Sequence, residues 1–390
     1  MNTDVHPHNR PNKRQEKHHL KRQGPPLPQR PPQRPKTTHK PQRPKSHSRP
    51  PPAVSSEVAS PAPLISSISH INHPVFEHIQ QVGDGTYGKV YKSLNSRTGE
   101  VVALKRLKLE SEREGLPITA VREIKLLESL KHEHIVNLTE MVISGKDIYM
   151  AFEYVENDLA GLLLNPALII TPSHIKSLFR QMMNGLAYLH QNSVVHRDIK
   201  GSNILLDNTG KIKLADFGLA RTVDLNDRDA HYTNRVITLW YRPPELLLGE
   251  TRYSTEVDIW SMGCLFAELF IRKALFPGKD EVSELEEIYK VMGTPNTKDW
   301  PNRHKLPWFH LITLPHYPGH FSQVFSGVTK QCYDLCINML QLNPCKRYSA
   351  HQVLRHDYFQ EEPQPKLLQL EGEWHDFDAK QARREREQKG

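Results

Sequence analysis

The chain has 390 residues, of which 37% are hydrophobic and 25% charged, and its formal net charge is +8. This length allows two domains, or one domain of two lobes with tails. No apolar run approaches the roughly 18 residues that a membrane-spanning helix needs, and four cysteines without a CxxC pair are too few for a disulfide framework. Composition therefore argues against a membrane protein and favours a reducing compartment.

The positive charge is concentrated in the first 52 residues, which hold 13 Lys and Arg against two acidic residues. Recurring prolines and few apolar side chains leave residues 1–73 unable to bury enough surface to offset their chain entropy, so we expect a disordered basic tail. Two uses remain open. The tail is either a solvated low-complexity segment, or it directs nuclear import or makes a weak RNA contact through clusters such as Lys13-Arg14 and Lys21-Arg22.

Order is expected to begin at Phe76, and the alternating runs from residue 79 to 104 predict β-strands. Between two of these runs lie Gly83, Gly85 and Gly88, whose lack of a Cβ would let backbone amides approach phosphate oxygens. The same spacing occurs in dinucleotide-binding folds, where a helix follows the loop. Here a second strand-like run follows, which favours a loop between two antiparallel strands.

Lys105 ends the next strand-like run. A lone lysine at a strand end most often faces solvent. Here a helix is predicted to begin at Pro117, because proline is favoured in the first turn and apolar residues repeat at helical spacing from Ala120. Glu123 on this helix can reach Lys105 and hold its ammonium group against phosphates.

The rest of the chain reads mainly as helical, and the loop from Val195 to Asn203 collects polar groups of different chemistry. Asp198 can accept a hydroxyl proton, Lys200 can face a phosphate, and Asn203 can bind a metal ion. Further along, Asp216-Phe217-Gly218 follows a short strand and offers a second ligand for Mg²⁺. Each motif alone has a bland interpretation, since charged loops are common.

Together, and in this order, the motifs resemble the signature set of eukaryotic protein kinases. The resemblance covers residues 76–359. It rests on the glycine loop and on Lys105, Glu123, His196-Arg197-Asp198, Asn203, Asp216-Phe217-Gly218, Glu245, Asp258 and Arg347. It implies an α+β fold with a small β-rich N-lobe at residues 76–154 and a larger helical C-lobe at residues 157–359. Residues 360–390 are then a charged extension, ending in a run at 380–389 that we expect to be a solvated helix.

Pro117–Glu123 (PITAVRE) and Thr238–Glu245 (TLWYRPPE) resemble segments of the cyclin-dependent kinases. The PITA-type helix, Asn234-Arg235-Val236-Ile237 and Glu373-Trp374-His375 are similar to the transcriptional branch of that family. The resemblance implies nuclear location, a cyclin bound through the Pro117–Glu123 helix, and Ser-Pro or Thr-Pro substrates. The RNA polymerase II C-terminal-domain repeats are then the expected substrate, with a role in promoting transcription elongation. Without cyclin, the Lys105–Glu123 pair is expected to be open.

The resemblance also implies roles for single residues. ATP is expected to contact Val82, Gly83, Gly85, Thr86, Gly88, Val90, Ala103, Lys105, Phe152, Glu153, Val155 and Asp158. The catalytic residues are Asp198, Lys200, Lys105 and Glu123, and the ligands of Mg²⁺ are Asn203 and Asp216. A buried Glu245–Arg347 ion pair is expected to tie the activation segment to the C-lobe.

Regulation and specificity are implied in the same way. Thr233 matches the activating phosphothreonine, with Arg122, Arg197 and Arg221 around its phosphate. Thr86 and Tyr87 match positions that carry inhibitory phosphates in cell-cycle relatives, although Tyr87 packed at the loop tip is the simpler interpretation. Ile237 is expected to have a positive φ and to be braced by Arg242. Its carbonyl then turns away from the substrate, which favours proline after the phosphosite because proline has no N–H to leave unpaired.

Other functions remain to be weighed. A pseudokinase scaffold usually lacks one of the catalytic Lys, Asp or Asn residues, and Lys105, Asp198 and Asn203 are all present. A protein whose main function is an RNA-binding tail leaves residues 76–359 unexplained. A cell-cycle or elongation-type kinase with a different cyclin is the nearest alternative.

Overall fold

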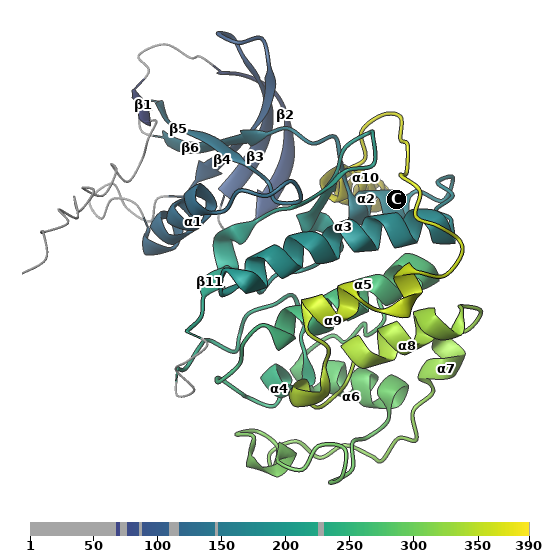
Figure 1. Cartoon of the computed structure of the whole chain (residues 1–390). Helices are drawn as coiled ribbons and strands as arrows, with labels where there is room; N and C mark the ends of the chain where they lie inside the picture. The colour runs from purple at the N-terminus through teal and green to yellow at the C-terminus, as the bar shows by residue number, and fades with distance from the viewer. Residues whose placement is uncertain are drawn as a thin grey trace, which may run out of the picture. The chain divides into compact units, whose positions relative to one another are not determined.

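The structure, a computed structural model, describes residues 68–70, 76–85, 88–108, 117–144, 147–224 and 230–389. All of these belong to one compact unit that runs from Ser60 to Gly390. Thr86, Tyr87 and the expected tail as far as residue 67 lie outside the described residues. Figure 1 shows a β-sheet flanked by helix α1, followed by a larger helical part. Within the described residues, no helix combines the length and apolar character needed to cross a bilayer.

The N-lobe is a six-stranded sheet in the order β1-β5-β6-β4-β3-β2. Its strands are β1 (Ile68–His70), β2 (Phe76–Gly85), β3 (Gly88–Asn95), β4 (Val101–Leu107), β5 (Leu138–Ser144) and β6 (Asp147–Glu153). Strands β2 and β3 are antiparallel, and Gly85 pairs with Gly88 at the loop between them. The predicted loop between two antiparallel strands is confirmed, since a strand and not a helix follows the glycines.

Strand β1 lies within the segment that was expected to belong to the disordered tail. Residues Ile68–His70 pair in parallel with Met141–Ile143 of β5, although the tail was expected to extend to residue 73. Without β1, strand β5 would be the edge of the sheet, and the unpaired amides and carbonyls of an edge strand readily accept another strand. Strand β1 covers this edge at three of the seven residues of β5.

Helix α1 (Ile118–Ser129) is the predicted helix that follows Pro117. Its buried face contains Ala120, Ile124 and Leu127, all at most 6% exposed. Apolar burial of this stripe fixes the rotation of the helix about its axis. The opposite face carries Ile118, whose side chain is 63% exposed.

The C-lobe is mainly helical, as the sequence predicted. Its helices are α2 (Leu159–Leu164), α3 (Pro172–Gln191), α4 (Pro244–Leu247), α5 (Glu256–Ile271), α6 (Glu281–Met292), α7 (Phe321–Val324), α8 (Lys330–Met339), α9 (Ala350–Leu354) and α10 (Asp376–Lys389). Two small sheets accompany them, one in the order β10-β9-β7 and one pairing β11 with β8. Their strands are β7 (Asn157–Asp158), β8 (Val194–Val195), β9 (Ile204–Leu206), β10 (Ile212–Leu214) and β11 (Arg221–Thr222).

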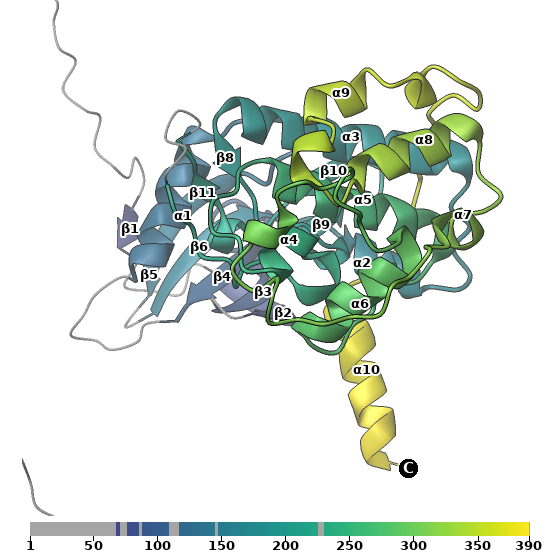
Figure 2. The same ribbon diagram turned by 90° about the horizontal axis from the view of Figure 1, so that it is seen from below.

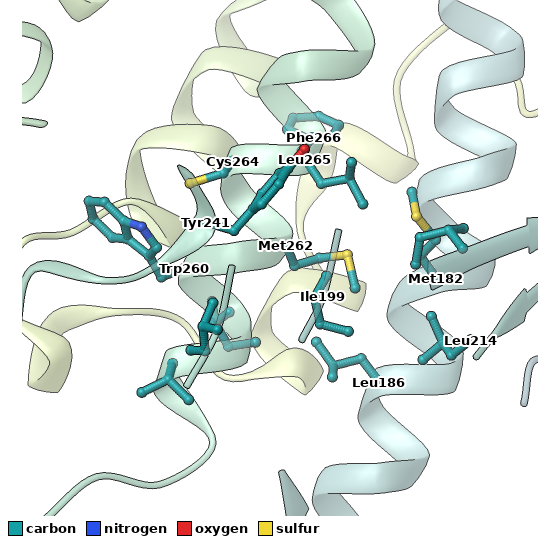
Figure 3. Close-up of a cluster of buried hydrophobic side chains, with 14 of the residues drawn as sticks. Met182, Leu186, Ile199, Leu214, Tyr241, Trp260, Met262, Cys264, Leu265 and Phe266 are labelled. Atoms are coloured by element: carbon teal, nitrogen blue, oxygen red, sulfur yellow. The ribbon is translucent and has the colours of Figure 1, made fainter. Parts of the chain in front are cut away.

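The core of the C-lobe reaches into the loop that was predicted to carry the chemistry. Figure 3 shows Ile199 between Leu186 of α3 and Met262 of α5. All three side chains are fully buried in the same hydrophobic cluster. Because Ile199 lies between Asp198 and Lys200, its burial anchors the backbone from which both polar side chains project.

The segment after Phe359 differs from the expected charged extension. Leu368 is 3% exposed, and α10 contacts both α2 and β2. Only the distal part of α10 is solvated as expected: residues 381–385 are exposed, and Figure 2 shows the yellow helix running away from the other elements. Apolar residues such as Leu368 pack the part of this segment before residue 381 onto the C-lobe.

Glu284 on α6 provides a test of stability against pH. Its side chain is fully buried, Oε2 accepts a hydrogen bond of 2.8 Å from the Gly278 amide, and Oε1 has no partner among the described residues. Burial raises the pKa of Glu284 from 4.5 to about 8. The folded state therefore keeps a proton that the unfolded chain releases, so the stability from this group is lost as pH rises from about 4.5 to about 8.

We expect the free energy of unfolding to fall by on the order of 2–3 kcal/mol from pH 6 to pH 9 because of this carboxyl group. Glu284→Gln should remove that part of the pH dependence in denaturant titrations. Glu287→Gln, at a side chain 32% exposed on the same helix, is the matched control. Equal pH slopes for wild type and Glu284→Gln would contradict the prediction.

Candidate active site

Asp198 lies at the centre of a network of hydrogen bonds. Its Oδ2 accepts from Lys200 Nζ at 2.7 Å and from Asn203 Nδ2 at 2.9 Å, and its Oδ1 accepts from Thr238 Oγ1 at 2.8 Å. The residue is 6% exposed. The side-chain nitrogen of Asn203 also donates to the Asp198 carbonyl. The side-chain oxygen of Asn203, Oδ1, is therefore the atom left to bind a ligand.

Asp258 on α5 hydrogen-bonds the backbone of the loop that carries Asp198. The Asp258 carboxylate accepts the amides of His196 at 2.8 Å and Arg197 at 2.9 Å, and it lies 3.0 Å from His190 Nε2. Complete burial opposes ionisation, but the hydrogen bond and charge of His190, the charge of His196 and the hydrogen bond from the Arg197 amide hold the pKa of Asp258 below its usual value. The charged carboxylate supports the left-handed turn at Arg197, whose φ is 65°.

Lys105 and Glu123 form a closed pair, with 2.7 Å between Nζ and Oε1, and Lys105 Nζ lies 3.0 Å from Asp216 Oδ1. Burial works against the charge of Lys105, but Asp216 and Glu123 raise its pKa overall. Burial raises the pKa of Glu123, and Lys105 offsets only part of this effect. The buried stripe of α1 holds Glu123 inward in this structure, and the expected opening of the pair without cyclin stays a prediction.

Asp216 has a left-handed backbone with φ of 60°. Burial works against its ionisation, yet Lys105 lowers its pKa, so the carboxylate stays charged. With Asn203 Oδ1 it supplies oxygen ligands, which hard divalent cations prefer. The chemistry of the donors therefore fits a magnesium ion held jointly with phosphate oxygens.

One cavity of about 450 Å³, within the range of small-molecule sites, is lined by Lys200, Asn203 and Thr238, the three residues that hydrogen-bond Asp198. Asp198 itself is not among the lining residues. Among the residues predicted to contact ATP, the cavity is lined by Val82, Gly83, Gly88, Val90, Ala103, Lys105, Phe152, Glu153, Val155 and Asp158. The predicted contacts of Gly85 and Thr86 stay predictions, because Thr86 and the surroundings of Gly85 lie outside what the structure describes. The predicted catalytic and metal-binding side chains Glu123, Lys200, Asn203 and Asp216 line the same cavity.

Several lining residues were not predicted from the sequence, and two groups of them matter most for the site. The first lies on and after β9 and β10, with Leu205 and Ala215, and the second comes from the C-terminal segment, with His375, Asp376, Phe377 and Lys380. The second group is tied to the residues between the lobes, since Tyr154 Oη donates to Glu373 at 2.9 Å and lies 3.1 Å from His375 Nε2. Lys92 of β3 also pairs with Glu373. The aromatic residues within this polar segment were the signal that could have revealed it.

The segment around Thr233 is only partly assembled. Thr233 is exposed, and its carbonyl accepts a 2.5 Å hydrogen bond from Tyr253 Oη, which in turn accepts from Arg197 Nη1 at 3.1 Å. Arg221 stacks on the ring of Tyr232 at 5.0 Å. Arg122 is exposed on α1. The structure thus links Arg197 to Thr233 through one hydroxyl group and places Arg221 beside the preceding residue.

Ile237 has a φ of 70° and is 3% exposed. Its carbonyl accepts from Arg242 Nη2 at 2.9 Å, and Arg242 Nε donates to the Val236 carbonyl at 3.0 Å. A positive φ is costly for a β-branched residue, so the conformation requires such support. The Ile237 carbonyl is held by the guanidinium group and is therefore not available to a substrate amide.

Comparisons with known proteins are consistent with this geometry. The sequence matches the family described as "Protein kinase domain" over residues 76–359. It is 50% identical over 320 residues to CTD kinase subunit alpha of Schizosaccharomyces pombe, covering 80% of this chain and 54% of that protein. It is 49% identical over 340 residues to CTD kinase subunit alpha of Saccharomyces cerevisiae, covering 85% and 64%.

A solved structure is also similar. A chain of the yeast RNA polymerase II CTD kinase CTDK-1 complex matches with a TM-score of 0.72 and 48% identity, covering 77% of this chain and 97% of that chain. The chain thus spans between about half and two thirds of the length of the two curated relatives. Since the family match extends over most of the residues and includes every element of the cavity except the C-terminal segment, this chain belongs to the protein kinase domain family.

Proposed function

We propose that the chain is the catalytic subunit of a cyclin-dependent serine/threonine protein kinase that uses ATP and Mg²⁺. The observation that carries this proposal is the convergence of two networks on one cavity. One network joins Asp198 to Lys200, Asn203 and Thr238, and the other joins Lys105 to Glu123 and Asp216.

Asp198 is placed to orient the substrate hydroxyl group and accept its proton as the oxygen attacks the γ-phosphorus. Lys200 offsets negative charge on the transferred phosphoryl group, and the leaving oxygen remains on ADP. Asn203 and Asp216 would hold Mg²⁺, which when bound would supply neutralising charge at the phosphate oxygens. Most of the rate enhancement then comes from positioning and electrostatics.

Nucleotide binding follows from the same cavity. The backbone groups of Glu153 and Val155 are placed to hydrogen-bond the adenine ring, and Phe152 closes the rear of the site. Lys105, oriented by Glu123, positions the α- and β-phosphates. Gly83 and Gly88 let the backbone of the β2–β3 loop approach the phosphates.

The proposed substrates are Ser-Pro and Thr-Pro sites. Arg242 holds the Ile237 carbonyl, so a residue with an N–H after the phosphosite would lose a hydrogen-bond partner. Proline has no N–H and loses nothing. Because two similar proteins are named CTD kinase subunit alpha, we propose the RNA polymerase II C-terminal-domain repeats as the substrate, with nuclear location and a role in transcription elongation.

The proposed regulatory subunit is a cyclin that binds α1. Ile118 is an exposed apolar side chain on this helix, and apolar contact with a partner would bury it. Since the Lys105–Glu123 pair is already closed here, the cyclin would act by keeping α1 in this position. The basic tail is proposed as an accessory RNA contact, which salt-dependent RNA binding lost on deletion of residues 1–60 would support.

The function is tested with the full-length chain and the cyclin that copurifies with it. We expect Mg²⁺-dependent phosphorylation of peptides with Ser-Pro, little phosphorylation of matched peptides with Ser-Ala, and near-absent activity of the chain alone. Nucleotide binding without phosphoryl transfer to any peptide would instead favour a pseudokinase scaffold. An array without proline preference would exclude the proposed role of Ile237.

Thr233→Ala should lower kcat/KM of the cyclin complex by on the order of 100-fold, because no phosphate would neutralise the neighbouring arginines and order the segment. Thr233→Ser, which can still be phosphorylated, is the matched control and should retain most activity. Steady-state kinetics with a Ser-Pro peptide provide the measurement. Wild-type rates for Thr233→Ala would rule out this residue as the activating phosphosite.

A further inference from the structure

Glu284 on α6 is a buried carboxyl group that the proposed mechanism does not use. The residue is 0% exposed, Oε2 accepts the Gly278 amide at 2.8 Å, and Oε1 has no partner among the described residues. Buried polar atoms nearly always have a hydrogen-bond partner, so an unpaired carboxyl oxygen needs an explanation. Gly278 packs so closely that a Cβ there would lie 2.4 Å from Glu284 Cα. One oxygen of Glu284 is thus fixed by packing, and the other can take a new partner.

Gly278 connects Glu284 to the segment that carries the proposed proline specificity. Its carbonyl accepts a hydrogen bond from Trp240 Nε1 at 2.9 Å. Trp240 lies in a short turn that ends just before Arg242, whose Nη2 donates to the Ile237 carbonyl at 2.9 Å. Two hydrogen bonds, both made by the backbone of Gly278, therefore link Glu284 to the turn that precedes Arg242.

Arg242 interacts with two carboxyl groups of α6. Its Nη1 lies 3.3 Å from Glu281 Oε1, and because the Glu281 side chain is 53% exposed, solvent screens this pair. The charge of Arg242 also acts on Glu284, where it opposes the larger effect of burial on the pKa. The other titratable groups coupled to Glu284 are Glu287 on α6 and Cys264 on α5, and neither is a cation. Arg242 is therefore the cation that an ionised Glu284 would attract.

We propose that Glu284 is a positioning residue for proline specificity: uncharged, it leaves the Arg242 guanidinium on the Ile237 carbonyl, and ionised, it draws the guanidinium away. The inference rests on the proposed Ser-Pro and Thr-Pro specificity. Burial raises the pKa of Glu284 to about 8. The carboxyl group is thus mostly uncharged at neutral pH and mostly charged at about pH 9.

The strength of the competing hydrogen bonds gives the direction of this effect. A buried carboxylate oxygen without a partner is costly, and a guanidinium group binds a carboxylate more strongly than it binds neutral carbonyls. Arg242 Nη2 would then leave the Ile237 carbonyl, which becomes free to accept the N–H of the substrate residue after the phosphosite. A residue other than proline no longer loses a hydrogen bond at this position, so the preference for proline falls.

The test uses the full-length chain in its cyclin complex and two peptides that differ only in having Pro or Ala after the serine. The ratio of kcat/KM for Ser-Pro over Ser-Ala should fall about tenfold in the wild type between about pH 6 and about pH 9. Glu284→Gln should keep the ratio seen at low pH throughout, because an amide does not ionise. Both peptides present the same hydroxyl group, so titration of the catalytic residues and of ATP cancels from the ratio.

Glu286→Gln, at a side chain 32% exposed on the same helix, is the matched control and should show the pH response of the wild type. A purely structural role of Glu284 would lower both rates together and leave their ratio independent of pH. A constant ratio in the wild type, or an equal fall in Glu284→Gln, would overturn the inference. A complex without proline preference at any pH would instead refute the proposed specificity, so the two failures are distinguishable.

Discussion

Asp198→Asn is expected to lower kcat by about 1,000-fold while the KM for ATP stays near the wild-type value. An amide cannot accept the substrate proton, and it cannot accept all the hydrogen bonds that Lys200, Asn203 and Thr238 now donate. Nucleotide binding depends mainly on other residues of the cavity. Steady-state kinetics of the cyclin complex with a Ser-Pro peptide provide the measurement.

Asp207→Asn is the matched control for this variant. This variant makes the same isosteric change in the β9–β10 turn. There, Asp207 Oδ1 accepts hydrogen bonds from the backbone amides of Thr209 and Lys211 at 2.9 Å. Its loss should change turn stability and leave kcat unchanged. If Asp198→Asn kept more than about a tenth of the wild-type kcat, Asp198 would not be the base.

Glu245→Gln is expected to lower the free energy of unfolding by about 3–5 kcal/mol. Arg347 donates to Glu245 Oε1 at 2.5 Å and to Oε2 at 2.6 Å, and the two side chains are 0% and 2% exposed. Neutralising Glu245 leaves a buried guanidinium charge without its partner. The pair was predicted from the sequence to join the activation segment to the C-lobe, so its loss should also destabilise that segment.

Denaturant titration of the variant against the wild type measures this effect. The control is Asp147→Asn, which removes the partner of Arg106 from an ion pair whose side chains are 35% and 47% exposed. Solvent screens such a pair, and its loss should cost less than about 1 kcal/mol. Similar losses for both variants would mean that burial does not determine the strength of the Glu245–Arg347 pair.

The sequence predicted those parts of the site whose residues are close together in the chain. Asp198, Lys200 and Asn203 are separated by a few residues, so one loop must bring them together. Glu123 was predicted to reach Lys105 because the apolar face of its helix indicated how the helix packs against the strand that ends at Lys105. Local spacing suggested these two groups, and the resemblance of the whole ordered set to protein kinases assigned their roles.

Contacts between distant segments were not predictable in this way. Gly161 and Trp374 are more than 200 positions apart, and neither residue alone indicates a contact. The pairing of β1 with β5 depends on an open sheet edge that no local pattern reveals. The closed geometry of the Lys105–Glu123 pair likewise depends on tertiary packing of α1.

The burial of Ile199 has a consequence for where the molecule can be switched. A side chain wedged into the core between α3 and α5 cannot leave without opening the C-lobe, so amide exchange at this loop should require global unfolding. Thr233 is exposed, and its segment can open at far lower cost. The loop that carries Asp198 and Lys200 is thus rigid, and we expect regulation to act by moving the segments around this loop.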